Sequence, residues 1–168
     1  RVAQLLEFRI DSEILMLVNG HFFWAPGESD ERNAQIELLL DWLDTQPADI
    51  PVIVVGDFNA EPESKSILTM RKYFDSAYRV IHGEEPEFTC PTPLPKSKRA
   101  KIRSLMNWAL RAHARPDLIW KGTLDYIFVD PRLHTTNCEV VLNQPDPENS
   151  MIYPSDHFGL VAHLDTQI

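Results

Sequence analysis

A run of β-branched residues at positions 52–55 ends on Gly56, Asp57, Phe58 and Asn59, and it constrains the fold more than any other segment. Such a run is typical of a buried β-strand. Side chains alternate along a strand, so Asp57 and Asn59 are expected to point the same way from its end, with Phe58 turned into the core. A carboxylate beside a carboxamide can take a proton from water, bind a hard cation or donate a hydrogen bond to an anion. Gly-Asp and Asn-Ala are also ordinary turn sequences, so this segment alone fits a strand-to-turn corner equally well.

Two further motifs place acidic residues beside strand-like runs. Asp125 begins the run 125–129, and Ser155, Asp156 and His157 precede another apolar run at 158–162. A neighbouring carboxylate raises the pKa of a histidine, which suits His157 to be held as an imidazolium. Taken singly, each motif is more often a surface turn. Together the three motifs predict that the ends of several strands meet at one rim of a sheet.

Three motifs occur in a characteristic order: Gly-Asp-Phe-Asn (56–59), Leu-Asp-Tyr-Ile-Phe-Val (124–129) and Ser-Asp-His-Phe-Gly-Leu (155–160). In this order they resemble the endonuclease/exonuclease/phosphatase superfamily, which includes deoxyribonucleases, deadenylases, sphingomyelinases and inositol polyphosphate phosphatases. The segment Val-Asn-Gly-His-Phe (18–22) is similar to the Asn-Thr-His strand end of that family, with Gly20 in place of the usual Thr. The resemblance implies an α+β fold, a two-sheet α/β/β/α sandwich with catalytic loops at one rim.

The resemblance also implies a catalytic role for each matching residue. Asp57 would hold and deprotonate the attacking water, and Asn59 would orient that water or hydrogen-bond the phosphorus centre. Asp125 would keep His157 protonated, so that His157 donates to an oxygen of the scissile phosphate. His21 would contact the same phosphate from the opposite side. These roles describe a hydrolase that cleaves a phosphate ester or phosphodiester by in-line attack of an activated water.

Metal binding is implied for Asp156, with Asp57 and Asn59 as further oxygen ligands. Mg²⁺ is the expected ion, and Mn²⁺ could substitute for it. In the family, strands before the Asn-Thr-His segment supply an early Asn and the main metal-binding Glu. Neither is visible here, since Glu7 and Glu13 lie in or beside the wrong strands, and the match covers roughly the C-terminal two-thirds of a family domain.

An N-terminally incomplete domain has physical consequences. We expect residues 1–168 either to self-associate through an exposed sheet edge or to be part of a longer protein. On their own they should bind Mg²⁺ weakly and show negligible turnover, because a hard cation needs several oxygen ligands.

Two classes of function follow. The first is a Mg²⁺-dependent phosphodiesterase or phosphatase that acts on nucleic acid or another phosphorylated substrate. The second is a catalytically incompetent fragment or binding module that keeps the fold but lacks the metal-binding Glu. The intact motifs favour the first for the parent protein. A third interpretation is an unrelated α/β protein whose acidic residues at strand ends match the family motifs by chance.

The net charge of −9 conceals a strongly basic segment. Residues 96–121 contain eight basic residues and one acid, a charge of +7 that leaves −16 on the rest of the chain. We expect Lys98, Arg99, Lys101 and Arg103 to bind substrate phosphates beside the acidic rim, with a solvated helix face as the alternative for any one of them. The whole of 84–122 is expected to be an irregular, proline-punctuated insertion with a short basic helix at 102–114.

Length and composition fit one soluble domain over residues 1–168, since 168 residues of which 43% are hydrophobic can bury a core. No apolar run approaches the ~20 residues of a membrane span. Cys90 and Cys138 match no zinc or redox spacing, and packing thiols in a reducing, cytoplasmic compartment are the expectation.

Local patterns predict the first elements. Strands are expected at 2–10 and 13–23, and a helix capped by Ser29 or Asp30 should end before Pro47. A second, short helix is expected at 64–70. Arg32 is interpreted as structural, with bracing of the site loops as the alternative.

Overall fold

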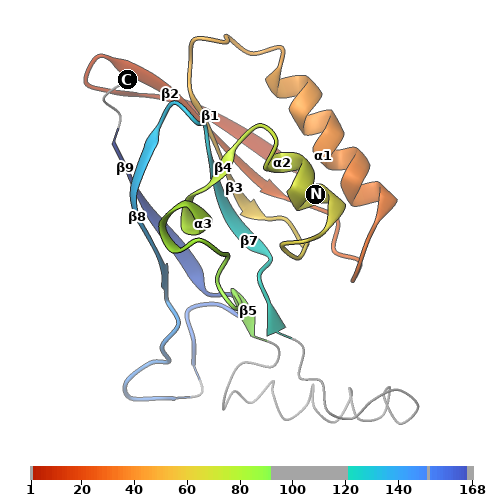
Figure 1. The fold of residues 1–168 in the computed structure, drawn as a ribbon. Helices are drawn as coiled ribbons and strands as arrows, with labels where there is room; N and C mark the ends of the chain where they lie inside the picture. Colours follow the sequence, from red (N-terminus) through yellow and green to blue (C-terminus); the bar gives the residue numbers. More distant parts are fainter. Residues whose placement is uncertain (1, 92–120, 151, 166–168) are drawn as a thin grey trace.

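A mixed five-stranded sheet lies at the centre of the computed structural model, which describes residues 2–91, 121–150 and 152–165 (Figure 1). Its strand order is β1 (Ala3–Ile10), β2 (Glu13–His21), β3 (Val52–Asp57), β7 (Asp125–Val129) and β4 (Asp75–Ser76). β3 runs parallel to β2, and every other pair in this sheet is antiparallel. Two antiparallel pairs stand apart from it: β8 (His134–Val141) with β9 (Gly159–Asp165), and β5 (Cys90–Pro91) with β6 (Lys121–Gly122).

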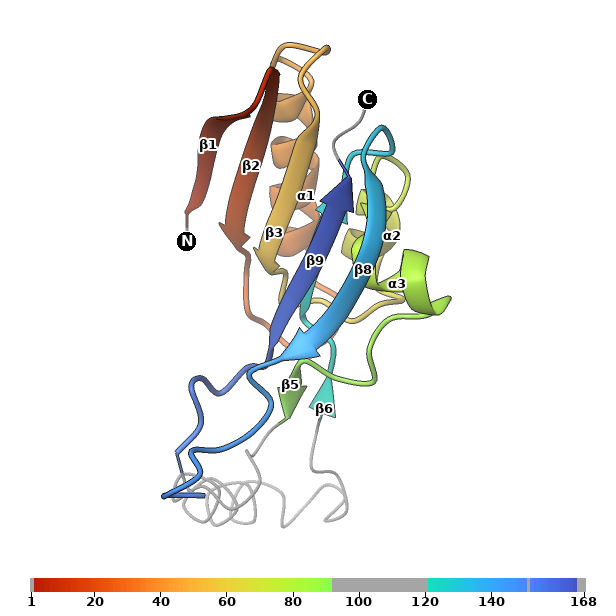
Figure 2. The same ribbon diagram turned by 90° about the vertical axis from the view of Figure 1, so that its left-hand side faces the viewer.

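Alternation of side chains along the central strands divides the apolar residues between two cores. Val18 and Val54 belong to the core beneath α1 (Asp30–Leu43) and α2 (Lys65–Met70). Leu15 and Ile53 belong to the core that includes residues of α3 (Ala77–His82), β8 and β9. Figure 2 shows α1 on one side of the central sheet and the β8–β9 pair on the other. The layers of helices, sheet and second sheet confirm the expected α+β sandwich.

Helix α1 begins and ends where the sequence predicts. The Ser29 hydroxyl accepts a hydrogen bond from the backbone N–H of Arg32 at 3.3 Å, and Asp30 and Glu31 place negative charge in the first turn. The helix ends at Leu43, ahead of Pro47. No helix within the described ranges is long and apolar enough to cross a membrane.

The structure contains one helix that the sequence analysis did not predict and corrects one local expectation. Residues Ala77–His82 form α3, with Gly83 in the left-handed conformation at the C-terminal end (φ 84°). Six residues are too few for a helical period to stand out in the sequence. Cys90 and Pro91 form a strand within the segment expected to be irregular, and Pro91 is tolerated because this short pair has no central strand. The helix expected at 102–114 and Lys98, Arg99, Lys101 and Arg103 lie outside the described residues.

Phe58 anchors the core directly beneath the strand ends, as the sequence predicts. Its side chain is 0% exposed, and its ring centroid lies 4.8 Å from that of Phe22 and 5.1 Å from that of Phe128. We expect Phe58→Ala to lower the free energy of unfolding by about 3–5 kcal/mol, because a large cavity would form. Urea unfolding followed by circular dichroism measures this change.

Tyr73→Ala is the matched control, since Tyr73 is an aromatic residue that is 58% exposed. Its effect should stay within about 0.5 kcal/mol. Equal destabilisation by the two substitutions would contradict the assignment of Phe58 to the core.

Candidate active site

One row of residues across three strands forms the base of the site. The backbone register pairs His21 with Asp57 across the parallel strands β2 and β3. The same Asp57 pairs with Asp125 across the antiparallel strands β3 and β7. Neighbouring strands are only about 4.8 Å apart, so the three side chains leave the sheet as neighbours. The structure therefore brings three residues from distant parts of the sequence to one rim.

Two glycines allow this close arrangement. Gly56 precedes Asp57 with φ 135°, and a Cβ atom there would lie 1.9 Å from the carbonyl oxygen of Gly20. Only glycine fits that position. A Cβ atom at Gly20, where the resemblance leads us to expect Thr, would meet ring atoms of Phe22 at 2.7 Å. Gly20 thus leaves room for the aromatic ring that packs on Phe58.

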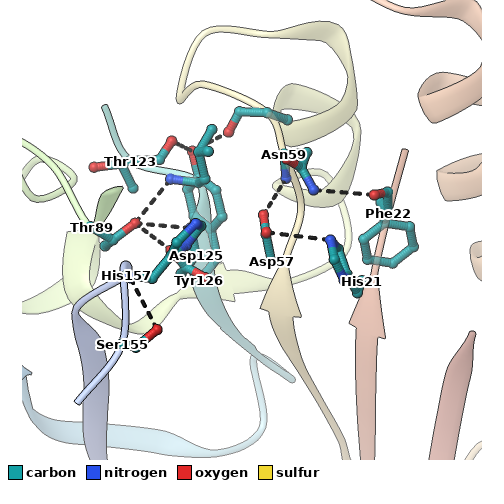
Figure 3. Close-up of polar contacts among 12 residues, drawn as sticks. His21, Phe22, Asp57, Asn59, Thr89, Thr123, Asp125, Tyr126, Ser155 and His157 are labelled. Carbon is teal, nitrogen blue, oxygen red and sulfur yellow. Dashed lines mark hydrogen bonds and ion pairs between the residues drawn. The ribbon is translucent and has the colours of Figure 1, made fainter. Parts of the chain in front are cut away.

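Asp57 and Asn59 come together through a turn, and not through the extended geometry expected from the sequence. β3 ends at Asp57, and Asn59 has φ 51°. The backbone N–H of Asn59 donates to Asp57 Oδ1 at 2.8 Å, and the Asn59 carboxamide donates to the carbonyl oxygen of Phe22 at 3.2 Å (Figure 3). A short polar residue can adopt the left-handed conformation and hydrogen-bond locally, which explains why asparagine fits this corner.

Asp57 lies between two histidines and beside a second acid (Figure 3). Its Oδ2 atom is 3.5 Å from His21 Nε2. Burial, followed by the negative charge of Asp125, raises the pKa of Asp57 above its ordinary value, while the Asn59 N–H, His157 and His21 act in the opposite direction. A carboxylate of raised basicity is better suited to accept a proton from water.

Asp125 and His157 form an ion pair on the other side of Asp57. His157 Nδ1 lies 2.8 Å from Asp125 Oδ2. This hydrogen bond, with a contact from Cys90 as the second cause, raises the pKa of His157 to about 11. At neutral pH the ring is an imidazolium, whose remaining N–H can donate to an anion.

Thr89 is a site residue that the sequence analysis missed. Its buried hydroxyl donates to Asp125 Oδ2 at 2.6 Å and accepts from the backbone N–H groups of Leu124 (3.0 Å) and Asp125 (3.1 Å). Its carbonyl oxygen accepts from the backbone N–H of Phe158 at 2.7 Å, next to His157. Thr89 therefore ties together the two segments that carry the ion pair. No local pattern distinguishes it, because its partners lie more than 30 residues away.

Arg32 braces the loop that follows His21. The buried guanidinium donates to the carbonyl oxygens of Phe23 (3.4 Å), Ala25 (2.9 Å) and Gly27. Gln35 on the same helix accepts from the backbone N–H of Phe23 at 2.9 Å. Arg32 therefore has a structural role, and that role is the one given as the alternative in the sequence analysis, because its hydrogen bonds brace a loop of the site.

The candidate metal ligands differ in position. Among the described residues, ligand atoms of Asp57, Asp125 and His157 lie within 4.8 Å of one another. Of these three residues, Asp57 is the best candidate for a metal ligand. The His157 imidazolium has no lone pair for a metal, and Asp125 Oδ2 already faces two hydrogen-bond donors. Asp156 is exposed beside His157 and lies outside this group.

Two other acids do not reach the row. Glu7 pairs with Met16 in the β1–β2 hairpin, and Glu13 begins β2 at the end opposite His21. The structure thus agrees with the sequence-based view that neither is the metal-binding Glu of the family.

The ion pair predicts a pH dependence that can be measured directly. A pKa raised from its ordinary value to about 11 means that the stability from the pair is fully present below pH ~6.5 and is lost as the pH rises through about 11. The ring resonances of His157 should therefore not titrate between pH 5 and 9 in an NMR experiment. Asp125→Asn should bring the midpoint down into that range, whereas Asp41→Asn on the exposed face of α1 should not. A midpoint near pH 6.5 in the unsubstituted protein would disprove the pairing.

Comparison with known proteins agrees with this architecture. The profile of the "Endonuclease/Exonuclease/phosphatase family" matches residues 3–157. Nocturnin of Homo sapiens is 30% identical over 176 residues, which cover 96% of this chain and 36% of nocturnin. The chain thus spans about a third of the length of the curated relatives that it matches first.

Two solved structures share the fold. D. rerio TDP2, complexed with a single-stranded DNA product, superposes with a TM-score of 0.72 at 16% identity, covering 98% of this chain and 61% of that chain. The human nocturnin catalytic domain with bound sulfate superposes with a TM-score of 0.66 at 27% identity, covering 97% of this chain and 51% of that chain. Because the family profile matches well over half of the residues, this chain belongs to the endonuclease/exonuclease/phosphatase family.

Proposed function

We propose that this chain carries the catalytic site of a Mg²⁺-dependent hydrolase that cleaves a phosphate ester or phosphodiester by in-line attack of water. The observation that carries the proposal is the His21–Asp57–Asp125 row with the imidazolium of His157 beside it. The row sets a basic carboxylate between two histidines, one of which is held protonated. In-line displacement at phosphorus needs such a base next to donors for the developing charge.

Asp57 holds the attacking water and takes its proton. The raised pKa of its carboxyl group supports this role, since a stronger base transfers the proton more readily near neutral pH. Asn59 orients the water or donates a hydrogen bond to an oxygen of the phosphorus centre. Its backbone N–H donates to Asp57 and its carboxamide donates to the carbonyl oxygen of Phe22, so the Asp57 and Asn59 side chains are held next to each other.

His157 and His21 contact the phosphate oxygens from opposite sides of Asp57. The remaining ring N–H of His157 donates a hydrogen bond to an oxygen of the scissile phosphate, and the bond between His157 Nδ1 and Asp125 keeps the ring protonated. Thr89 holds Asp125 through its hydroxyl, so the orientation of the imidazolium is fixed before substrate binds. Donors already aimed at the developing charge stabilise a transition state without reorganisation.

Asp156, Asp57 and Asn59 would hold Mg²⁺, or Mn²⁺ in its place. Two carboxylates and a carboxamide form a set of hard oxygen donors, which fits these cations. When bound, the ion supplies positive charge that neutralises the phosphate oxygens.

The substrate is a phosphorylated molecule, with nucleic acid among the candidates. Of the two superposed structures, D. rerio TDP2 is complexed with a single-stranded DNA product and human nocturnin has a bound sulfate anion. Lys98, Arg99, Lys101 and Arg103 lie outside the described residues, and the charge of +7 on residues 96–121 is what supports phosphate binding by them.

A binding module without catalysis is the second candidate. It is favoured by the position of Glu7 and Glu13 away from the row. Metal-dependent turnover distinguishes the two candidates, because a binding module would retain phosphate affinity and hydrolyse nothing.

The catalytic proposal predicts the ranking of three variants in a protein that carries the complete family domain, because residues 1–168 on their own are expected to show negligible turnover. With Mg²⁺ and a panel of phosphate esters, Asp57→Asn and His157→Asn should each lower kcat by about 10²–10⁴, the usual contribution of a general base or acid. Asp125→Asn should cost less, because it removes only the partner of His157. His163→Asn, on the exposed face of β9, should leave kcat unchanged. Activity of Asp57→Asn within a few-fold of the unsubstituted protein would refute the role of Asp57, provided that the circular dichroism spectra match.

A further inference from the structure

A cleft of about 560 Å³ opens beside the catalytic row. Asn59 and His157, which lie beside the row, line it on one side. Trp24 and Glu28 line it from the loop after His21, and Glu61 and Glu63 line it from the segment after Asn59. A group of the substrate next to the reacting phosphate would therefore enter this cleft.

Trp24 offers a large aromatic surface at this cleft. The side chain is 63% exposed, although the loop that carries it is held firmly in place. Arg32 binds the carbonyl oxygens on both sides of Trp24, those of Phe23 and Ala25, and Gln35 binds the backbone N–H of Phe23. Trp24 presents a flat apolar face to solvent, which suits it to stack on a planar ring. Because its loop is already braced, stacking would cost little further backbone entropy.

The charges of the described lining residues disfavour a second phosphate in the cleft. Its acidic lining residues are Glu28, Glu61 and Glu63, and among the described lining residues the basic group is His157, which faces the row. A carboxylate repels a phosphate but accepts N–H donors, and the single bond that Glu28 Oε1 receives from the backbone N–H of Lys65 (3.1 Å) leaves acceptor capacity on that group. The occupant is thus an uncharged planar group with N–H donors.

We propose that this cleft binds the nucleobase of a nucleotide substrate, stacked on Trp24, while the phosphate of the same nucleotide lies against His157 and Asn59. The inference rests on the proposed function for the position of the phosphate. Nucleobases combine an uncharged aromatic ring with exocyclic or ring N–H groups, so they match both the tryptophan face and the carboxylates.

Calorimetric binding to the full chain in Mg²⁺ tests the assignment with three probes, namely AMP, ribose 5-phosphate and phenyl phosphate. AMP should bind about 5- to 100-fold more tightly than ribose 5-phosphate, which lacks the base. Trp24→Ala should abolish this preference, and Trp24→Phe should retain most of it. Trp42→Ala is the matched control, because Trp42 is a partly exposed tryptophan on α1 that lines a different groove; it should change nothing.

Each other outcome overturns the inference. Equal affinity for AMP and ribose 5-phosphate, or a preference for AMP that survives in Trp24→Ala, would show that no base stacks on Trp24. A preference for phenyl phosphate over AMP that depends on Trp24 would assign the cleft to an aryl ester instead. Failure of the proposed function is distinguishable, since a protein that carries the complete family domain would then show no Mg²⁺-dependent turnover of any ester, whatever its preference for AMP.

Discussion

The register of three neighbouring strands is the constraint on which the site depends. β2, β3 and β7 are aligned so that His21, Asp57 and Asp125 occupy one row at the rim of the sheet. The row requires β2 and β3 to approach closely at Gly56, where a Cβ atom would collide with the backbone of Gly20. A slip of one residue in either strand would turn these side chains to the opposite face. The apolar residues of the same strands resist such a slip, because each face of the sheet packs against its own core.

The row places two carboxylates next to each other, an arrangement that is unfavourable unless positive charge compensates it. The compensation comes from the imidazolium of His157, which is bound to Asp125. Thr89 adds a hydrogen bond to the same oxygen of Asp125 that His157 contacts. The two acids therefore have different environments. Asp125 accepts hydrogen bonds from Thr89 and His157, whereas burial raises the pKa of Asp57.

The sequence predicts the elements of this fold well where a long period or a strong cap marks them. The β1–β2 hairpin, α1 with its Ser29 cap and the buried strand before Asp57 all appear as expected. The motifs at strand ends, taken in their order along the chain, also identify most members of the row, because strand ends lie together at the rim of a sheet. Local patterns do not extend to contacts between distant segments, so Thr89 and the Trp24 cleft could not be found in this way. At Asn59 the sequence is compatible with both an extended strand end and a turn, and the structure has the turn, with Asn59 in the left-handed conformation.

The central claim is that water, activated by Asp57, displaces the leaving group at phosphorus in a single step. The stereochemistry at phosphorus tests it most directly. A protein that carries the complete family domain would hydrolyse a phosphate ester made chiral at phosphorus with oxygen isotopes and sulfur, in isotopically labelled water with Mg²⁺. A single in-line displacement predicts inversion of configuration in the product. Retention would contradict the account, because it would require a covalent enzyme intermediate and would make a side chain, not water, the nucleophile.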